Sequence, residues 1–151
     1  MIGIVQRVTE ANVAVDSNVV GEIELGLAVL VAVAADDTQA DVDWMAAKLA
    51  GLRIFRNGDK HFDLDVVQVS GAMLLVSNFT VAAETRKGRR PSLDGAADPA
   101  KGRELFDALV VKLRELGIHV ETGRFGASMK VSIVNDGPAT FIVDSADARK
   151  I

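Results

Sequence analysis

Two short stretches of this sequence place polar side chains next to unusual backbone residues, and these are where chemistry could occur. The first is Asn135-Asp136-Gly137-Pro138-Ala139-Thr140, between the apolar runs 131–134 and 141–143. An Asp-Gly step between two strands predicts a tight hairpin, so a plain β-turn is one interpretation. Pro138 argues for another, because proline removes a ladder donor and a Gly-Pro bond can be cis. Such a rigid step would turn backbone carbonyls in an unusual direction and could form the working part of a site.

The second stretch is Ser77-Asn78-Phe79-Thr80, at the end of the apolar run 72–80. If the whole run is a strand, its period of two puts Asn78 and Thr80 on one face and Ser77 and Phe79 on the other. Polar residues that close an apolar strand often place a site at the rim of a sheet. The alternative interpretation is a strand that simply emerges into water. Asn78-Phe79-Thr80 also matches a glycosylation sequon, a chance match in a chain without a secretion signal.

The side chains available for catalysis are few. The chain has no cysteine, and its two histidines, His61 and His119, have no partner at metal-ligand spacing. We therefore expect no metal site and no cofactor, and no Ser-His-Asp order can be assembled. Catalysis would have to rely on positioned backbone amides, hydroxyls and groups of the substrate itself. Hydrolysis of an activated ester fits this limitation, because an oxyanion hole supplies much of the stabilisation it needs.

Charge is distributed so that one loop could bind nucleic acid although the whole chain is acidic. The net charge of −4 argues against an unspecific polyanion binder. Residues 84–98 contain Gly88, Pro91 and Gly95 and predict an exposed loop, with four cations: Arg86, Lys87, Arg89 and Arg90. These side chains could contact phosphates, or the segment could be an ordinary solvated loop. The sequence shows no signal peptide, and its most apolar run, 27–35, is too short for a membrane helix, so we expect a cytoplasmic protein.

The hydrophobic pattern predicts the elements that position these stretches. Residues 2–15 and 19–23 form a hairpin, and 27–35 a buried strand. A helix follows, with its apolar stripe at Val42, Met45, Leu49 and Leu52, and a second helix begins at Asp98-Pro99 and ends at Gly117. Further strands are expected at 53–55, 64–69, 72–80, 118–121, 129–134 and 139–143. The predicted fold is α+β, a mainly antiparallel barrel-like sheet with two packed helices, in a single domain over residues 1–151.

Four segments together resemble the D-aminoacyl-tRNA deacylase family. They are Ile4-Val5-Gln6-Arg7-Val8, Ser77-Asn78-Phe79-Thr80, Thr122-Gly123-Arg124-Phe125 and Asn135-Asp136-Gly137-Pro138-Ala139-Thr140. The resemblance extends from residue 1 to about residue 143. It implies hydrolysis of the ester that joins a D-amino acid, or misattached glycine, to the terminal adenosine of tRNA, which is chiral proofreading in translation.

The resemblance also implies roles for individual residues. The family works as a homodimer, so Gly137 and Pro138, joined by a cis bond, would enter the partner's site, bind the substrate's α-amino group and exclude an L side chain. Asn135, Thr140 and Arg7 would belong to the same substrate-binding group, with Arg7 bracing the loop. The catalytic stretch would be Ser77, Asn78, Phe79 and Thr80, with backbone amides near Phe79 as oxyanion donors. Whether Thr80 is a nucleophile stays open; attack by water assisted by the tRNA ribose hydroxyl is favoured.

The basic loop would contact phosphates of the tRNA acceptor end through Arg86, Lys87, Arg89 and Arg90. Asn78 departs from the family's usual glutamine and has a shorter reach. Residues 146–151 extend beyond the usual end and would form, at most, a disordered tail. Two rival functions remain: a hydrolase of small activated esters, which would not need the basic loop, and a non-catalytic RNA-binding protein, which would tolerate loss of the Ser77–Thr80 rim.

Overall fold

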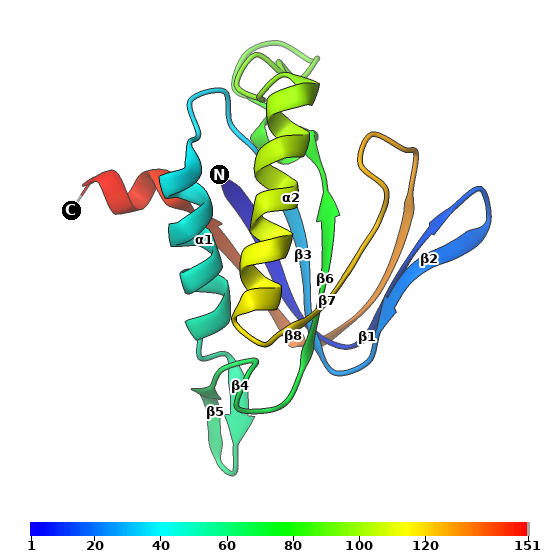
Figure 1. Ribbon diagram of the computed structural model, residues 1–151, viewed down its shortest axis with the longest axis vertical. Coiled ribbons are helices and arrows are strands. Elements are labelled where there is room, and N and C mark those ends of the chain that lie inside the picture. The colour runs from blue at the N-terminus through cyan, green and yellow to red at the C-terminus, as the bar shows by residue number, and fades with distance from the viewer. Residues whose placement is uncertain (151) are drawn as a thin grey trace.

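The computed structural model describes residues 1–150, apart from the side chain of Arg149. Two helices lie side by side against one face of a strongly curled sheet (Figure 1). The sheet contains β1 (Ile2–Val15), β2 (Asn18–Ile23), β3 (Gly26–Ala32), β6 (Ala72–Ser77), β7 (His119–Thr122) and β8 (Lys130–Asp144). A separate hairpin is formed by β4 (Phe55–Asn57) and β5 (Lys60–Leu64), and the helices are α1 (Gln39–Gly51) and α2 (Pro99–Glu115). The predicted α+β class with two helices is confirmed.

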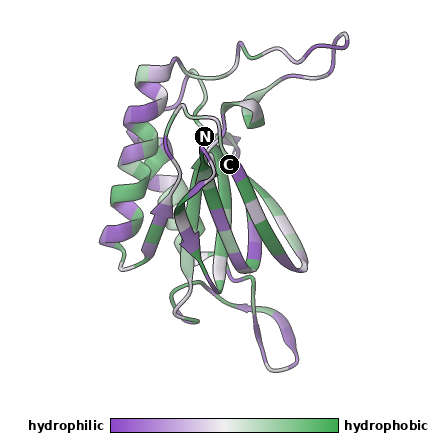
Figure 2. Cartoon of the chain, turned by 90° about the vertical axis from the view of Figure 1, so that its right-hand side faces the viewer, coloured by the Kyte–Doolittle hydropathy of each residue, from purple (hydrophilic) through white to green (hydrophobic). Residues whose placement is uncertain are grey.

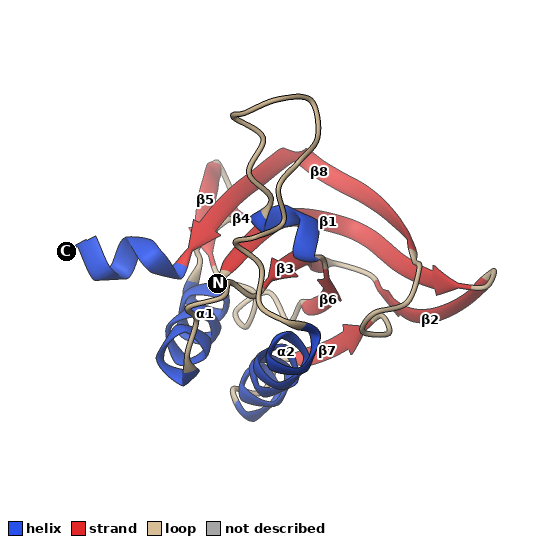
Figure 3. Ribbon diagram, turned by 90° about the horizontal axis from the view of Figure 1, so that it is seen from above, coloured by secondary structure: helices blue, strands red, loops and turns tan. Residues whose placement is uncertain are grey.

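The sheet is mixed, which corrects the expectation of a mainly antiparallel one. The strand order is β2-β1-β3-β6-β7. β8 lies outside this path and pairs with β1. β1 is antiparallel to β2, β3 and β8, whereas β3–β6 and β6–β7 are parallel. Parallel neighbours need a long crossover. α1 with the β4–β5 hairpin supplies the first crossover and α2 the second, and the curled sheet seen from above in Figure 3 has both helices on one side.

β8 is one continuous strand, so the predicted hairpin at Asp136-Gly137 is wrong. Residues on both sides of this step pair with β1: Gln6 lies opposite Thr140 and Val8 opposite Asn135. Between these two pairs β1 has one residue and β8 has four, residues 136–139. The extra residues form a bulge that leaves the strand and returns to it, which also explains how Pro138 is tolerated in a paired strand.

Apolar packing holds the sheet on both faces. Between the helices and the sheet, Leu27, Met73 and Leu75 are buried against Met45 of α1 and Leu109 of α2. On the other face, a smaller cluster forms where β2 and the first half of β8 curl over the sheet; it includes Val8, Val13, Leu74 and Val76. Hydrophobic residues accordingly dominate the central strands (Figure 2). Two cores on opposite faces fix the central strands that carry the candidate site.

Polar residues cap the start of both helices, and the second helix starts where the sequence predicts it. Thr38 is the N-cap of α1, where the Asp41 carboxylate accepts a 2.9 Å hydrogen bond from the Thr38 backbone N–H. Asp98 caps α2 by accepting hydrogen bonds from the N–H groups of Ala100 and Lys101. Leu52, the last residue of the stripe predicted for the first helix, falls at the C-cap of α1 and is not buried. No helix within residues 1–150 is long and apolar enough to cross a membrane.

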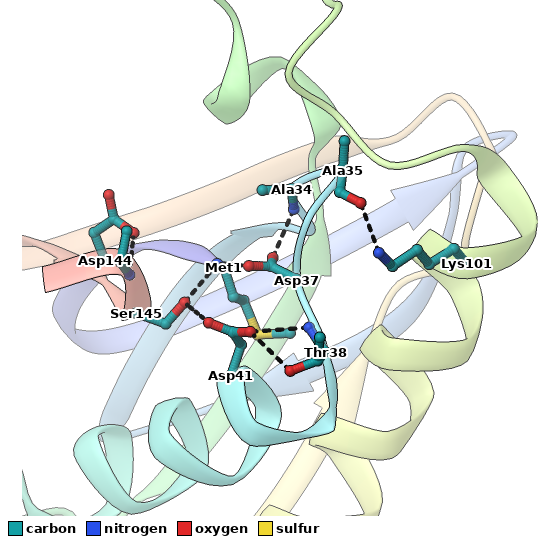
Figure 4. Close-up of polar contacts among 10 residues, drawn as sticks. Met1, Ala34, Ala35, Asp37, Thr38, Asp41, Lys101, Asp144 and Ser145 are labelled. Carbon is teal, nitrogen blue, oxygen red and sulfur yellow. Dashed lines mark hydrogen bonds and ion pairs between the residues drawn. The ribbon is translucent and has the colours of Figure 1, made fainter. Parts of the chain in front are cut away.

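A buried polar cluster joins the start of β1 to the end of β8 (Figure 4). The Met1 ammonium forms an ion pair with Asp37 and donates a 2.7 Å hydrogen bond to the Ser145 hydroxyl. That hydroxyl donates to Asp41 at 2.7 Å, and the second Asp37 oxygen accepts from Ala34 N–H. The ammonium and the Asp37 carboxylate are fully buried, so each depends on the other for compensation of its charge.

Three further local expectations differ from the structure. Residues 64–69 were expected as a strand, but the strand is β5 at Lys60–Leu64, and residues 66–70 form turns. The strand expected over 72–80 ends at Ser77, and Phe79–Ala82 forms the short 3-10 helix η1. Residues Ser145–Lys150 form a second 3-10 helix, η2, where a disordered tail over 146–151 was considered; residue 151 lies outside the described residues.

Candidate active site

A mostly apolar cleft with a volume of about 740 Å³ opens beside the end of β6. Ser77, Asn78 and Phe79 form one edge. Its floor comes from Leu30 of β3, Val76 of β6 and Ile133 of β8, and its far wall from the start of α2 and the segment after β7. The predicted rim stretch therefore borders a real concavity, with a volume in the range of small-molecule sites.

The end of β6 differs in detail from the predicted strand rim, because the alternation of side chains stops where η1 begins. Asn78 N–H donates to the Val31 carbonyl at 2.8 Å, and the Asn78 carbonyl accepts the first bond of η1, from Val81 N–H at 3.2 Å. The N–H groups of Phe79 and Thr80 precede that bond and have no acceptor within η1. They are the backbone donors that an oxyanion could use, next to the cleft edge.

Thr80 is exposed, and its hydroxyl donates a hydrogen bond to the side-chain oxygen of Asn78. An amide oxygen cannot remove the hydroxyl proton, so this contact does not activate Thr80 as a nucleophile. It also occupies the side-chain amide oxygen of Asn78. Phe79 is 59% exposed and stands at the mouth of the cleft.

The far wall of the cleft depends on a glycine in α2. Gly102 faces the Phe125 ring, and a Cβ built at Gly102 would lie 3.3 Å from the tip of that ring. Phe106 lies one turn further along α2, with its ring 6.1 Å from that of Phe125. Neither Gly102 nor Phe106 has a local pattern that predicts a role in a site, and no role was expected for Phe125. Only tertiary packing brings these three residues to the cleft.

The Asn135–Thr140 stretch forms the bulge of β8, and it is held from inside by Asn135. The Asn135 side-chain amide donates to the backbone carbonyls of Arg7 at 2.8 Å and Ala139 at 3.0 Å. Its oxygen accepts from the Thr140 hydroxyl at 3.2 Å, and that hydroxyl accepts from Gln6 Nε2 at 3.1 Å. The Gly137–Pro138 bond at the tip is cis, and both residues are exposed. Asn135 and Thr140 thus support the bulge from within the same chain.

Arg7 lies beneath the bulge and is only 3% exposed. Its Nε contacts the Asp136 carbonyl at 3.2 Å and the Asp136 carboxylate at 3.1 Å. Nη1 donates to the Ile54 carbonyl at 2.7 Å, just before the β4–β5 hairpin. The guanidinium also lies 5.8 Å from the centre of the Phe62 ring of that hairpin. Arg7 therefore ties the bulge to β1 and to the hairpin, which agrees with the expectation that it braces the Gly-Pro loop.

Within one chain the two predicted halves of the site do not meet. Ser77 pairs with Val31, and Val31 pairs with Gly3, whereas the bulge lies opposite Arg7. Four residues along β1 and three strand spacings from β6 to β8 separate the two stretches by roughly 20 Å along the sheet. Neither Gly137 nor Pro138 lines the cleft. The cleft of one chain therefore lacks the Gly-Pro tip of the same chain.

The predicted basic loop is exposed, but its four cations are not equivalent. Arg86 forms hydrogen bonds to both carboxylate oxygens of Glu84. This hydrogen-bonded pair lowers the pKa of Glu84 and raises the pKa of Arg86. Lys87, Arg89 and Arg90 have no such ion pair within residues 1–150. These three are the cations of the loop that are free to meet a phosphate.

Comparison with known proteins gives a consistent result. The family described as D-Tyr-tRNA(Tyr) deacylase matches residues 4–144. A D-aminoacyl-tRNA deacylase of Chromohalobacter salexigens is 52% identical over 145 residues, covering 96% of this chain and 100% of that protein. Another, of Desulfitobacterium hafniense, is 50% identical and covers 96% of this chain and 97% of that protein.

Solved structures show the same fold. The chain described as c-Myc DNA Unwinding Element Binding Protein superposes with a TM-score of 0.91 at 32% identity, covering 95% of this chain and 98% of that chain. A probable eukaryotic D-amino acid tRNA deacylase superposes with a TM-score of 0.80 at 16% identity, over 94% of this chain and 98% of that chain, and at this identity it supports the fold alone. On the match over residues 4–144 and the full-length relatives, this chain belongs to the D-Tyr-tRNA(Tyr) deacylase family.

Proposed function

We propose that this protein hydrolyses the ester of D-aminoacyl-tRNA, and of mischarged glycyl-tRNA, to release the free amino acid and tRNA. The observation that carries the proposal is that, in a chain of this family, the site is divided into two parts that do not meet. A cleft whose one carboxylate, Asp98, is already engaged as the N-cap of α2 stands at one end of the sheet, and a braced, exposed Gly137-Pro138 tip stands about 20 Å away. Since tRNA is aminoacylated and used in the cytoplasm, the activity belongs in that compartment.

The residues of the cleft suit an ester that is already activated. The apolar walls at Phe106 and Phe125 accept the terminal adenosine, and the N–H groups of Phe79 and Thr80 stabilise the oxyanion. Water adds to the ester carbonyl carbon, the bond to the ribose oxygen breaks, and that oxygen leaves with a proton. Because the Thr80 hydroxyl donates to Asn78, a ribose hydroxyl of the substrate is the group placed to assist the water. Asn78 and Thr80 then position the substrate, and Ser77 lines the ester.

Chirality is read by the backbone of Gly137 and Pro138, which enter the cleft of a partner chain in a homodimer. Their carbonyls accept hydrogen bonds from the substrate's α-amino group and leave no space for an L side chain. Two observations support a dimer through this part of β8. The bulge is exposed although Arg7 and Asn135 hold it rigidly. Ile142 of the same strand is 76% exposed, and its neighbour across the sheet, Ile4, extends this apolar face.

The tRNA acceptor end lies over the loop beside η1 in this proposal. Lys87, Arg89 and Arg90 supply phosphate contacts, and Arg86 contributes less because Glu84 already occupies its guanidinium. Contacts of this kind add affinity that falls as salt concentration rises.

The activity is tested by comparing hydrolysis of D-Tyr-tRNA and L-Tyr-tRNA by the protein and by its Pro138→Ala variant. We expect rapid loss of the D ester alone, and we expect the variant to lose this activity. Equal cleavage of both esters would contradict a chirality-reading loop. Cleavage of a short aminoacyl ester in preference to charged tRNA would instead indicate a small-ester hydrolase.

The contribution in trans is tested by mixing two inactive variants. Ser77→Phe blocks the cleft but keeps the tip, and Pro138→Ala keeps the cleft but alters the tip. Unfolding and refolding them together makes about half of the dimers mixed, each with one complete site, so about a quarter of the wild-type activity should return. Mixtures that stay inactive, although each variant is shown to form dimers, would place the tip outside the partner's site.

A further inference from the structure

A second groove lies beside the cleft, on the other side of the wall formed by Phe106 and Phe125. It has a volume of about 610 Å³ and runs between α2 and the segment that follows β7. Three arginines line it: Arg103 and Arg114 from α2, and Arg124 from the segment after β7. Asp107 is the one carboxylate in the lining, so the groove has a formal charge of +3 − 1 = +2 in a chain whose net charge is −4.

Arg103 is held at the wall between the two cavities. Its guanidinium lies 4.9 Å from the centre of the Phe125 ring, and Nη2 donates to the Phe125 carbonyl at 3.4 Å. The ring in turn lies against Gly102. A guanidinium stacked on an aromatic ring keeps its remaining N–H donors directed outward, and it is weakly hydrated, which suits it for binding phosphate.

Arg124 precedes Phe125 in the chain and is exposed. Within the described residues, no ion pair joins Arg124 or Arg103 to Asp107 or to another carboxylate. Arg114 differs, because its Nη2 donates to the Val120 carbonyl at 2.8 Å and it stands in the last turn of α2, where the helix disfavours anions. The cations free to bind an anion are therefore Arg103 and Arg124, next to the Phe125 wall.

We propose that Arg103 and Arg124 bind a phosphate of the tRNA strand that leads to the terminal adenosine. The proposal rests on the proposed function, because a nucleotide chain whose last adenosine fills the cleft must leave it over one of its walls. Phe125 belongs to both cavities, so a strand that crosses it reaches the groove within one nucleotide. Cationic side chains next to an accessible aromatic ring are the usual surface for a single-stranded nucleic acid end, and Phe125, which is half-buried, still borders both cavities. This contact is separate from the loop of residues 84–98.

The test uses two substrates that differ only in their phosphates. D-Tyr-tRNA carries the acceptor strand, whereas 3′-D-tyrosyl-adenosine has the ester and the nucleoside but no phosphate. The variants are Arg124→Gln, Arg103→Gln and the double variant; Lys48→Gln on α1 removes the same charge away from both cavities and serves as the control. We expect the KM for D-Tyr-tRNA at 0.1 M salt to rise about fivefold per lost contact, and the salt slope to fall by about 0.7 each. Hydrolysis of tyrosyl-adenosine should not change.

Other outcomes separate the possible failures. An equal loss on both substrates would mean that the arginines only shape the cleft through Phe125, and unchanged kinetics on both would mean that no phosphate is bound; either result overturns the proposal. Binding of uncharged tRNA, measured without catalysis, supplies an independent readout. If the wild-type protein hydrolyses neither ester, the proposed function is wrong. If the arginine variants still reduce the salt slope of tRNA binding in that case, the proposal that the groove binds a phosphate is nevertheless supported. If the salt slope of tRNA binding is the same in the arginine variants as in Lys48→Gln, the groove binds no phosphate, and the proposed function is not affected by that result.

Discussion

The Arg7 guanidinium reaches across the sheet to Asp136, contacting both its backbone carbonyl at 3.2 Å and its carboxylate at 3.1 Å. Nε makes both of these contacts and holds the base of the bulge, while Nη1 of the same fork donates to the Ile54 carbonyl. Lysine cannot reproduce this fork, so Arg7→Lys should release the Gly137-Pro138 tip. We expect kcat for D-Tyr-tRNA to fall by at least about tenfold, equivalent to about 1.4 kcal/mol, with little change in KM. Arg56→Lys, on the exposed face of the same hairpin, should leave both constants unchanged.

Asn135 fills the inside of the bulge with two donated hydrogen bonds, to the Arg7 and Ala139 carbonyls. Asn135→Asp keeps the shape but places oxygens against those carbonyls, which should cost about 1–3 kcal/mol per group left unsatisfied. The midpoint of urea unfolding should fall accordingly, and D-ester hydrolysis should fall with it. Ser132→Ala, on an exposed position of the same strand, is the matched control. An unchanged midpoint in Asn135→Asp would show that the bulge does not depend on these bonds.

The Thr80 hydroxyl donates a hydrogen bond to the side-chain oxygen of Asn78. An amide oxygen cannot remove the hydroxyl proton, so we expect no acyl intermediate on Thr80. Thr80→Val should therefore keep D-ester hydrolysis well above the uncatalysed rate, with a loss of no more than about 10²-fold from poorer positioning. Rapid mixing of enzyme with excess D-Tyr-tRNA should show no burst of product. A burst, or loss of activity to background in Thr80→Val with activity retained in Thr80→Ser, would identify Thr80 as the nucleophile.

Arg86 and Arg89 carry the same charge but differ in their partners, because only Arg86 is bound to Glu84. If the basic loop contacts phosphates, Arg89→Gln and Arg90→Gln should each lower the salt slope of tRNA binding by about 0.7 to 0.9. Arg86→Gln should change it less. Titrating salt in a tRNA-binding assay measures the slopes of all three variants. If the wild-type protein and the Arg89/Arg90 double variant have equal slopes, the loop does not contact tRNA phosphates.

Asp37 compensates the buried Met1 ammonium and also accepts a hydrogen bond from Ala34. Asp37→Ala leaves a buried charge without its partner, which typically costs about 3–5 kcal/mol. The free energy of unfolding in urea should fall by this amount. Asp59→Ala, in the exposed turn between β4 and β5, should change it by less than about 0.5 kcal/mol.

The pattern of apolar residues predicted the two helices because it depends on local spacing, and Asp98, where the sequence placed the start of the second helix, is the N-cap of α2. It could not show that β3 and β6 run parallel, since that direction depends on how a crossover returns to the sheet. The Asp-Gly step predicted a hairpin for a sound local reason. The pairing of β1 with both sides of the bulge overrode it.

The sequence identified the two candidate stretches by their composition, but it did not identify the residues that surround them in the fold. Arg7 was expected to brace the loop, and its guanidinium lies against Asp136; its second anchor, the Ile54 carbonyl, lies just before a hairpin that the sequence placed differently. Gly102, Phe106 and the stacking of Arg103 on Phe125 have no local signature, because the contacts join α2 to Phe125, which is at least 19 residues away in the sequence.

The continuity of β8 has a consequence for a dimer with two sites. Val131 and Ile133 of this strand line the cleft of their own chain, and in the proposed dimer Pro138, a few residues later on the same strand, would enter the neighbouring cleft. A single length of backbone would then touch both catalytic centres. Occupancy of one centre should bias the other, so that titration with a non-hydrolysable D-aminoacyl analogue departs from two independent sites.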